Sequence, residues 1–561
     1  MRQTVPGARA RAVLAGLLPR RADWTPARRN PRRDLLAGLT VAIVALPLAL
    51  AFGVSSGLGA QAGLATAIVA GILAAVFGGS NLQVSGPTGA MTVVLVPIVH
   101  RFGAGGVLMV GLLAGAILVG LAVAKTGRFI QFVPAPVIEG FTAGIAVVIA
   151  LQQVPAALGI AGVDGERVWQ VAFEAAARYV ATPDPVPLVM ALAVAGLMLA
   201  GGRRRPGVPF SLIGVVLATV IAEAGGLDVA RIGALPVTLP APSLGFVDLG
   251  TLSALLPSAL AVAALAALES LLCASVADAM SVGEKHDPDR ELFGQGIANL
   301  AAPLFGGVPA TAAIARTAVN VRSGAQSRLA ALSHAVVLAV IVLAASGLVG
   351  RIPLAALAGV LLATTVRMVE VASMRAIARA TRGDALVLTL TFIVTVALDL
   401  VTAVAVGIGV AIVLALRAIA RTVQVEQVPL EAGDHSQEEQ RLLAEHIVAY
   451  RFDGPLFFAA AHRFLLELSK VADVRVVILR MSRVSTIDAT GAQVLGDVIT
   501  RLERRGITVL LSGIRPGHDH VLAALGVADH LRQDGLIFPD TPTAIKHARG
   551  LVTGLSPAPS V

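Results

Sequence analysis

The feature that most restricts the fold of this chain is a helix-breaking stretch inside a long apolar region. It reads Gln83-Val84-Ser85-Gly86-Pro87-Thr88-Gly89-Ala90-Met91-Thr92. Gly86, Pro87 and Gly89 interrupt regular helices, and proline suits the first turn of a new one. We therefore expect extended chain before Pro87 and a short helix from there to about His100. That helix is too short to cross a bilayer, which takes roughly 20 apolar residues.

A second break of the same kind lies far downstream. It reads Phe305-Gly306-Gly307-Val308-Pro309-Ala310-Thr311-Ala312-Ala313-Ile314-Ala315-Arg316. Non-helical backbone at membrane depth is stable only where it is buried in protein or lines a cavity. Paired interrupted segments in two halves of an apolar chain indicate a binding site at the bilayer midplane. The alternative is a pair of kinked helices without a ligand.

The composition places these breaks in a membrane protein. The chain has 561 residues, of which 56% are hydrophobic and only 14% are charged, whereas soluble proteins carry about 25% charged residues. Its net charge of +9 does not indicate nucleic acid, because the basic residues gather in short segments between apolar runs. The single cysteine, Cys273, excludes an internal disulfide and a multi-cysteine metal site. With no nucleophile–base set or phosphate loop in view, we expect no enzyme, cofactor or metal centre.

The apolar runs divide into two equal sets. We predict membrane segments at 35–54, 62–79, 87–100, 105–124, 135–158, 185–201, 209–225, 255–281, 291–306, 311–321, 329–349, 352–368, 384–400 and 403–421. The third and tenth of these fourteen carry the breaks, which are equivalent places in two sets of seven. An odd number of spans per half inverts the second half relative to the first. The predicted fold is thus a polytopic helical membrane protein built as a seven-plus-seven inverted repeat.

Charge predicts the orientation and the domain boundaries. Arginine clusters, such as Arg203-Arg204-Arg205, follow the even-numbered spans, so we predict that the N-terminus is cytoplasmic. The expected location is the inner membrane or plasma membrane of the cell. Residues 1–33 form a cytoplasmic arm, with at most a short surface helix around 10–18, and 34–421 form the transmembrane transport domain. Residues 422–442 are a polar linker, 443–550 a soluble α/β domain, and 551–561 a disordered tail. In the soluble domain we expect strands at 474–481 and 507–512 and helices at 458–470, 491–505 and 519–525.

The two breaks have the chemistry of an anion site. A helix N-terminus exposes backbone N–H groups without intrahelical partners, and the helix dipole adds about half a positive charge there. In an inverted repeat the two short helices can direct these ends at each other and hold an anion between them. Thr88 and Thr311 can add hydroxyl donors. The remaining site residues, beside Pro87, are small and let a ligand approach the backbone: Gly86, Gly89, Ala90, Ala312 and Ala313.

Two charged residues inside the spans need partners or water, because each costs at least a few kcal/mol in the bilayer. Glu269 is either a protonatable group facing the site or a structural partner in an ion pair or a buried hydrogen bond. Arg316 supplies positive charge to the anion, pairs with Glu269, or extends toward the cytoplasmic surface. Phe52 in the first span either closes the pocket with its ring or only packs.

The sequence resembles the sulfate permease (SulP) family, whose relatives include the solute-carrier anion exchangers. The resemblance covers about 34–550 and rests on 34–40 with 51–53, on 83–89, on Glu269-Ser270-Leu271-Leu272 with Val276-Ala277-Asp278, on Gly294-Gln295-Gly296-Ile297-Ala298-Asn299, and on 307–316. It implies a core domain and a gate domain, a homodimer, and a small anion such as sulfate, bicarbonate or a dicarboxylate as substrate. It also implies a site between the starts of the third and tenth spans, flanked by the first and eighth.

The resemblance further implies the coupling ion. Glu269 stands where proton-linked members carry a glutamate, and Cys273 stands where sodium-linked members have a threonine ligand. Coupling to protons rather than sodium is therefore expected. The soluble domain resembles a STAS domain (sulfate transporter and anti-sigma-factor antagonist) through Ser485-Thr486-Ile487-Asp488-Ala489-Thr490-Gly491. Thr490 occupies the position that is phosphorylated in anti-sigma antagonists, or it caps the following helix.

The leading prediction is a secondary active transporter that moves a small anion by alternating access of the core against the gate, with Glu269 coupling it to protons. Two alternatives stay open from the sequence. One is an anion channel of the same fold. The other is a membrane-anchored signalling protein whose STAS domain is the working part.

Overall fold

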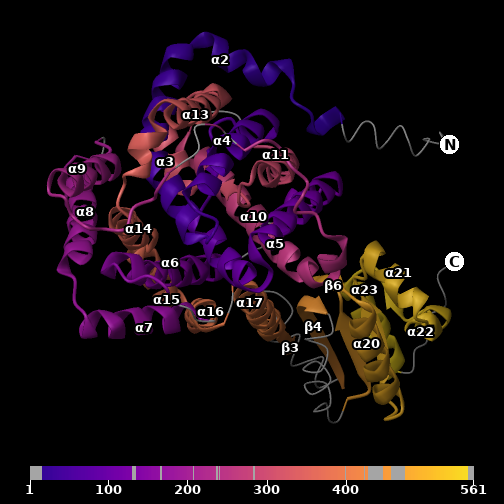
Figure 1. Ribbon diagram of the computed structural model, residues 1–561. Helices are drawn as coiled ribbons and strands as arrows, with labels where there is room; N and C mark the ends of the chain where they lie inside the picture. The colour runs from indigo at the N-terminus through magenta and orange to yellow at the C-terminus, as the bar shows by residue number, and fades with distance from the viewer. Residues whose placement is uncertain are drawn as a thin grey trace. The chain divides into compact units, whose positions relative to one another are not determined.

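The computed structural model describes residues 15–128, 134–163, 167–205, 208–234, 238, 240–281, 285–398, 400–422, 424–427, 446–456 and 474–553. The chain forms two compact units, Met1–Gly409 and Val410–Val561 (Figure 1). Most of the predicted arm, 1–14, most of the linker, the helix expected at 458–470 and most of the tail lie outside the described residues.

The first unit is helical. Its principal helices are α3 (Pro31–Ser55), α4 (Ala60–Phe77), α5 (Gly89–Val123), α6 (Ala135–Leu158), α8 (Pro185–Arg204), α9 (Phe210–Ala224), α10 (Leu252–Met280), α11 (Pro288–Ala301), α12 (Ile314–Arg322), α13 (Arg328–Gly350), α14 (Leu354–Met368), α16 (Arg382–Ala397) and α17 (Leu400–Thr422). Among the described residues, eight helices are long and apolar enough to cross a membrane, and shorter apolar helices cover Phe210–Ala224 and Thr402–Ala418. The helices agree with the predicted segments, while the total of fourteen crossings stays a prediction.

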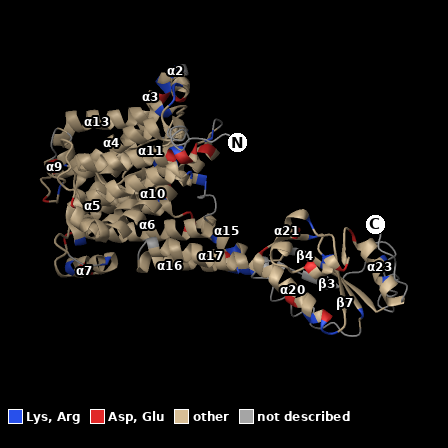
Figure 2. Ribbon diagram, turned by 90° about the vertical axis from the view of Figure 1, so that its right-hand side faces the viewer, with Lys and Arg blue, Asp and Glu red and all other residues tan. Residues whose placement is uncertain are grey.

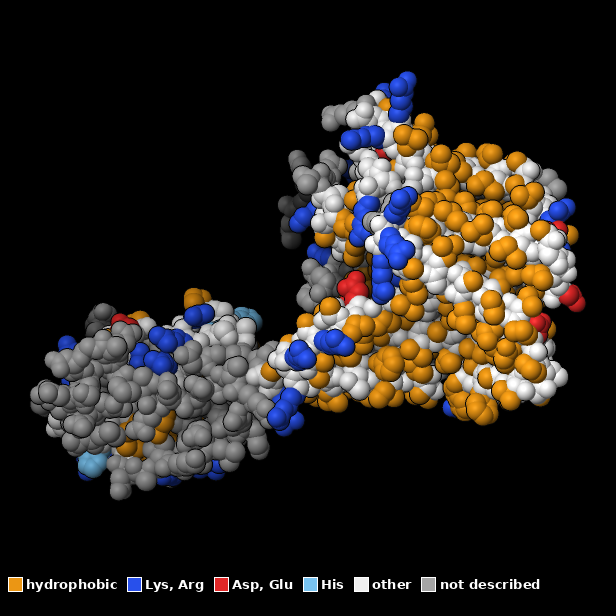
Figure 3. All heavy atoms as spheres, turned by 90° about the vertical axis from the view of Figure 1, so that its left-hand side faces the viewer, with side chains coloured by type: hydrophobic (Ala, Val, Ile, Leu, Met, Phe, Trp, Pro, Cys, Tyr) orange, Lys and Arg blue, Asp and Glu red, His pale blue; other side chains and the backbone are white. Residues whose placement is uncertain are grey.

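The surface of this unit fits a membrane environment. Figure 2 shows few charged residues within the helical body and most of them near its ends. In the space-filling view, apolar side chains cover most of the visible face of the body (Figure 3). Exposed apolar side chains of this unit include Val189, Leu217 and Val340, which lie on three different helices. This chain is an integral membrane protein, because a soluble protein would not leave so much apolar surface in water.

The interruption predicted between the third and fourth segments is present inside α5. The helical run from Gly89 to Val123 contains Gly103, whose φ of 69° is left-handed and therefore non-helical. The expected third and fourth segments, 87–100 and 105–124, are the two parts of this run. Glycine tolerates this conformation because it lacks a Cβ.

Two amphipathic helices were missed by the sequence analysis. They are α7 (Val168–Ala181) and α15 (Val371–Ala380), which lie between apolar helices. Each is short and carries charges, so neither met the length and composition expected of a span. On α7 the side chains of Trp169 and Phe173 are exposed, at 46% and 76%.

The N-terminal arm is attached to the transport unit. Its described part contains η1 (Arg21–Trp24) and α2 (Thr25–Arg29), and α3 begins at Pro31, four residues before the expected start. Asp23 accepts two hydrogen bonds from Arg290 of α11, at 3.1 and 2.7 Å. Burial raises the pKa of Asp23, but the Arg290 and Arg20 hydrogen bonds outweigh it and hold this pKa below its ordinary value. The arm is therefore anchored beside α11.

Glycines let α11 approach its neighbours closely. A Cβ on Gly294 would lie 2.4 Å from the backbone nitrogen of Gly78, and a Cβ on Gly296 would lie 3.0 Å from the backbone oxygen of Gly115. Both distances are too short for a side chain, so α11 packs backbone to backbone against α4 and α5. Such packing through small residues is typical of membrane helices.

The second unit contains a mixed sheet. Its strands are β3 (Gln424–Gln427), β4 (Ile447–Leu456), β5 (Val476–Arg480), β6 (Val484–Ile487), β7 (Thr508–Ser512) and β8 (Ile537–Phe538). The order is β3-β4-β5-β7-β8, with β6 paired to β4 and only β3 antiparallel. Helices α20 (Ala489–Glu503), α21 (Pro516–Ala524), α22 (Asp529–Gln533) and α23 (Thr541–Thr553) complete it. The expected strands at 474–481 and 507–512 and helices at 491–505 and 519–525 correspond to β5, β7, α20 and α21.

Candidate functional site

The two broken segments meet and form a two-stranded antiparallel sheet. Strand β1 (Ser85–Gly86) pairs with β2 (Thr311–Ala312), so that Ser85 lies opposite Ala312 and Gly86 opposite Thr311. The pairing extends by one bond from the amide of Ala313 to the carbonyl of Val84, at 3.0 Å. We call the paired residues 85–86 and 311–312 the crossing. Because the strands are antiparallel, the helices that follow them leave the crossing in opposite directions. Their N-termini are therefore close together, as expected from the inverted repeat.

The two helices begin immediately after these strands. Thr88 is the N-cap of α5, and its hydroxyl accepts a bond from the amide of Met91 at 3.4 Å. Ala313 is the N-cap of α12 and offers no side-chain acceptor. The first amides of each helix have no intrahelical acceptor. Both ends can therefore donate hydrogen bonds to an anion.

Glu269, which lies on α10, forms hydrogen bonds with both broken segments. Its Oε2 accepts hydrogen bonds from the hydroxyls of Thr88, at 3.0 Å, and Thr311, at 2.5 Å. The two threonine oxygens are themselves 3.1 Å apart. Thr88 and Thr311 are buried, whereas Glu269 is partly exposed. The carboxylate thus occupies both hydroxyl donors at the crossing and retains an accessible side.

Arg316 lies against β1. Only 1% of the residue is exposed, and its Nη2 donates to the carbonyl of Pro87 at 2.8 Å. A Cβ on Gly86 would lie 2.6 Å from Nη1 of Arg316, so this guanidinium needs a glycine at that position. Among the described residues, Nη1 has no hydrogen-bond partner, and no ion pair joins Arg316 to Glu269. The predictions of a surface-directed arginine and of a direct pair with Glu269 are therefore wrong for this conformation.

Helix α11 holds the crossing in place through three polar residues four positions apart. Glu291 accepts bonds from the amides of Gly79 and Ser80 and from the side chains of Gln83 and Gln295, at 2.8 to 3.1 Å. Gln295 also contacts the hydroxyl of Ser85 at 2.6 Å. Asn299 exchanges two bonds with the backbone of Ala310, at 2.8 and 2.9 Å. These residues were not among the predicted site residues.

A four-residue spacing of polar side chains inside an apolar helix is a readable signal, because it places them on one face. Two more residues support the crossing. The Ser270 hydroxyl accepts from the amide of Ala312 at 3.2 Å, and the Thr317 hydroxyl accepts from the amide of Val84 at 3.0 Å. Cys273 donates to the same Thr317 hydroxyl at 3.1 Å.

The remaining predicted residues also gather here. Ala90 and Ala312 are buried, at 2% and 0%, and Ala313 is partly exposed. Phe52 of α3 is 6% exposed, and its ring lies 3.1 Å from where a Cβ on Gly89 would be. The structure therefore brings together all ten predicted binding residues and Glu269. Their binding roles stay predictions.

Comparison with known proteins identifies the family of this chain. Residues 32–391 match the model of the sulfate permease family, and residues 442–544 match that of the STAS domain. The chain belongs to the sulfate permease family.

Two relatives illustrate the range of the family. A protein of Bacillus subtilis (strain 168) with the provisional name of sulfate transporter YvdB is 35% identical over 509 residues, covering 88% of this chain and 94% of that one. The bicarbonate transporter BicA of Synechocystis sp. is 32% identical over 502 residues, covering 86% and 88%. The solved structure of murine Solute Carrier 26 family member A9 superposes with a TM-score of 0.83, covering 98% and 96% at 17% identity. The chain thus has the fold of an anion-transporter family and a C-terminal STAS domain.

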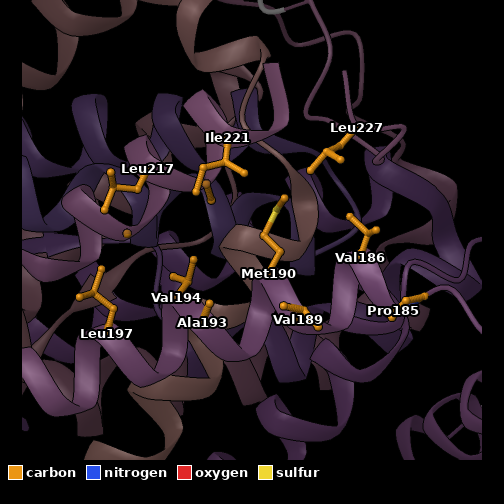
Figure 4. A pocket seen from close by; sticks show the side chains of 12 residues that line it. Pro185, Val186, Val189, Met190, Ala193, Val194, Leu197, Leu217, Ile221 and Leu227 are labelled. Atoms are coloured by element: carbon orange, nitrogen blue, oxygen red, sulfur yellow. The ribbon is translucent and has the colours of Figure 1, made fainter. Parts of the chain in front are cut away.

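A cavity elsewhere in this sulfate permease is chemically different. A space of about 420 Å³ lies between α8 and α9 and is lined only by apolar residues, among them Met190, Val194 and Ile221 (Figure 4). No side chain that lines it can donate a hydrogen bond to an anion. The crossing, rather than this cavity, therefore has the donors that an anion requires.

In the STAS domain, Asp488 rather than Thr490 caps the helix. Its Oδ1 accepts from the amide of Gly491 at 2.7 Å, at the start of α20. Thr490 is exposed in the first turn of that helix. The alternative that Thr490 is the cap is wrong, and its phosphorylation stays a prediction.

Proposed function

We propose that this sulfate permease is a secondary active transporter that couples the movement of one small anion to a proton through Glu269. Sulfate, bicarbonate and a C4-dicarboxylate are the substrate candidates. The observation that carries the proposal is the contact of the Glu269 carboxylate with the hydroxyls of Thr88 and Thr311 at the start of both broken helices. An ionised Glu269 and a bound anion would compete for these two donors.

The local charge explains the coupling. With Glu269 ionised, its charge offsets that of the buried Arg316, and the pocket carries no net charge to attract an anion. Protonation of Glu269 leaves Arg316 and the two helix dipoles unopposed, which makes the pocket positive. A proton and an anion then enter the pocket together. Sodium has no part in this mechanism.

The exposure of the site supports alternating access. Phe52 on α3 and Ile149 on α6 are 6% and 1% exposed. Ile314, at the start of α12, is 43% exposed. The side of the crossing that Phe52 and Ile149 cover is therefore sealed, whereas the start of α12 carries an exposed side chain. Movement of the core, which contains α5, α10 and α12, against the gate, which contains α6, would reverse this arrangement.

Proton-driven uptake into liposomes tests the proposal. Purified protein should accumulate labelled sulfate, bicarbonate or fumarate under an inward proton gradient. Glu269→Gln keeps an oxygen that can accept from the threonines but cannot carry the proton. We expect this variant to exchange anion downhill and to lose accumulation driven by the proton gradient.

Glu174→Gln is the matched control, because Glu174 on α7 has a side chain that is 45% exposed and pairs with Arg178. It should accumulate anion like the unaltered protein. If Glu269→Gln accumulates anion with an unchanged pH dependence, the coupling role is wrong. Currents far above the turnover of a transporter would indicate a channel instead.

We also propose that the arm and the STAS domain are cytoplasmic and that the protein is a homodimer. The arginine cluster 203–205 supports the orientation. Cys273 is fully buried, so single cysteines can be added to the natural chain. Arg204→Cys should react with an impermeant maleimide only from the inside, and Asp248→Cys only from the outside. Light scattering in nanodiscs should give twice the mass of one chain.

A further inference from the structure

On the sealed side of the crossing, Ile149 of α6, the proposed gate helix, covers the start of α5 together with Phe52. A Cβ on Gly89 would lie 2.3 Å from Cδ1 of Ile149, so the Ile149 side chain packs directly on the first residue of α5. Phe52 packs against the same point, 3.1 Å from that Cβ position. Ile149 therefore covers the helix end that we propose to face the anion. An anion that approaches from the gate must displace it.

A hydrogen bond joins α6 and α3 about one helical turn beyond Ile149 and Phe52. Nε2 of Gln153 on α6 donates to the hydroxyl of Ser55 on α3 at 3.1 Å. Gln153 follows Ile149 by four residues and Ser55 follows Phe52 by three, so the polar and the apolar contact lie on the same faces of their helices. The face of α6 between Ile149 and Gln153 is thus the face turned to the core.

Gln152 lies next to this face, on the side of Ile145, and its amide has no hydrogen-bond partner among the described residues. Both Nε2 and Oε1 are buried, and neither has a hydrogen-bond partner among the described residues. At 3.6 residues per turn it lies roughly 60° around α6 from Ile149 and about 20° from Ile145. Ile145 and Ile149 both belong to the apolar cluster that contains Phe52. An unpaired buried amide is unfavourable, so this one calls for a partner in another state of the protein.

The chemistry of that partner follows from the two unpaired atoms. Nε2 needs an acceptor and Oε1 needs a donor, side by side. Sulfate at neutral pH offers acceptors only, and so do nitrate and acetate. Bicarbonate carries an O–H and a charged oxygen on the same carbon, and it can satisfy both atoms of a primary amide at once.

We propose that Gln152 is a specificity-determining residue, and that it selects a hydrogen-bearing oxyanion, bicarbonate, over oxyanions that only accept hydrogen bonds. The proposal rests on the proposed function and names its substrate class. When Ile149 withdraws from Gly89, the anion reaches the N-terminus of α5, and the Gln152 amide binds its O–H and one of its oxygens. The helix ends supply the charge recognition, and Gln152 supplies the selection.

Competition in liposomes tests the selection. Uptake of labelled bicarbonate is measured against unlabelled nitrate, which is planar like bicarbonate and lacks the O–H. The unaltered protein should prefer bicarbonate, and Gln152→Leu should raise the KM for bicarbonate roughly tenfold with little change in the inhibition constant of nitrate. Gln152→Asn, which keeps both amide atoms on a shorter side chain, should retain part of the preference. Gln153→Leu is the control, because it removes the contact with Ser55 and leaves the Gln152 amide in place.

Thermal unfolding gives a second measurement that does not need transport. Gln152→Leu removes a buried unpaired amide, so its unfolding temperature without ligand should be at least that of the unaltered protein. Bicarbonate should raise the unfolding temperature of the unaltered protein more than nitrate does, and this difference should disappear in Gln152→Leu.

Two outcomes would overturn the inference and leave the proposed function standing. One is proton-driven uptake of sulfate in a protein that does not take up bicarbonate. The other is an unchanged ratio of bicarbonate to nitrate affinity in Gln152→Leu. Absence of any proton-driven anion uptake, in the unaltered protein as in Glu269→Gln, would instead reject the proposed function.

Discussion

The two broken segments have the same backbone plan and different chemistry. Each forms a short strand and then a helix, and each contributes a threonine hydroxyl to Glu269. The first segment supplies space, through Gly86 and Gly89, and it caps its own helix with Thr88. The second supplies charge through Arg316, which reaches across to the carbonyl of Pro87. The two segments therefore share the geometry of the crossing, and under the proposed function they would divide the tasks of binding.

The largest effect should come from adding a side chain at Gly86, which would remove the space that the first segment supplies. Gly86→Ala places a Cβ 2.6 Å from Nη1 of Arg316, at a φ of 156° that side chains rarely adopt. We expect a loss of at least about 2 kcal/mol of stability, seen as a lower unfolding temperature and poor recovery of monodisperse protein. Gly120→Ala, in the helix α5 that follows β1 and with open space around the added methyl, should be harmless.

The next largest effect should come from removing the charge in the second segment. Arg316→Gln keeps a donor for the Pro87 carbonyl and loses the cation. Charge-assisted hydrogen bonds are about twice as strong as neutral ones, so the KM for the anion should rise roughly 10- to 100-fold. Arg316→Lys should recover part of the affinity. An unchanged KM in Arg316→Gln would show that the helix ends alone bind the anion.

Replacing each threonine by valine should separate their tasks. Thr88→Val removes a helix cap and a donor to Glu269, whereas Thr311→Val removes a donor only. We expect the first variant to lose about 1 kcal/mol more stability and both to transport more slowly. Unfolding temperature and initial uptake rate measure the two effects. Equal unfolding temperatures would show that the Thr88 cap contributes nothing.

The smallest effect should come from the arm, which contacts the first segment only indirectly, through α11. Asp23 binds Arg290, and the neighbouring Glu291 holds the loop that leads into β1. The pKa of Asp23 is depressed, so the contact stabilises the fold above the unfolded pKa of about 3.9 and loses that contribution as the pH falls through the folded value. Trypsin should cleave the arm faster in Asp23→Asn than in the unaltered protein at pH 7. A change of less than about 1 kcal/mol in overall stability is expected, because the pair attaches only the arm, which can separate while the rest of the unit stays folded.

Cleavage of the unaltered protein at low pH, by a protease active there, should approach that of Asp23→Asn. Equal cleavage of the two proteins at neutral pH would show that the ion pair does not hold the arm.

Much of the site was predictable because its signals are local. Gly86, Pro87 and Pro309 interrupt the apolar runs whatever surrounds them, and a helix that starts inside the membrane exposes its amides in any fold. Glu269 was recognisable because an acid in an apolar segment is costly and requires a function or a partner. The amphipathic helices α7 and α15 were missed because they are too short and too polar to meet the criteria for a span.

The sequence by itself determined where the helices break, that two halves carry matching breaks, and that the chemistry there suits an anion. These are properties of neighbouring residues: glycine and proline conformation, apolar length and the cost of a charge in lipid. Only the tertiary structure decided that Gly86 lies opposite Thr311, that Arg316 binds Pro87 instead of Glu269, and that the Gln152 amide has no hydrogen-bond partner among the described residues. Such pairings join residues far apart in the chain, and a shift of one residue in register would change every partner.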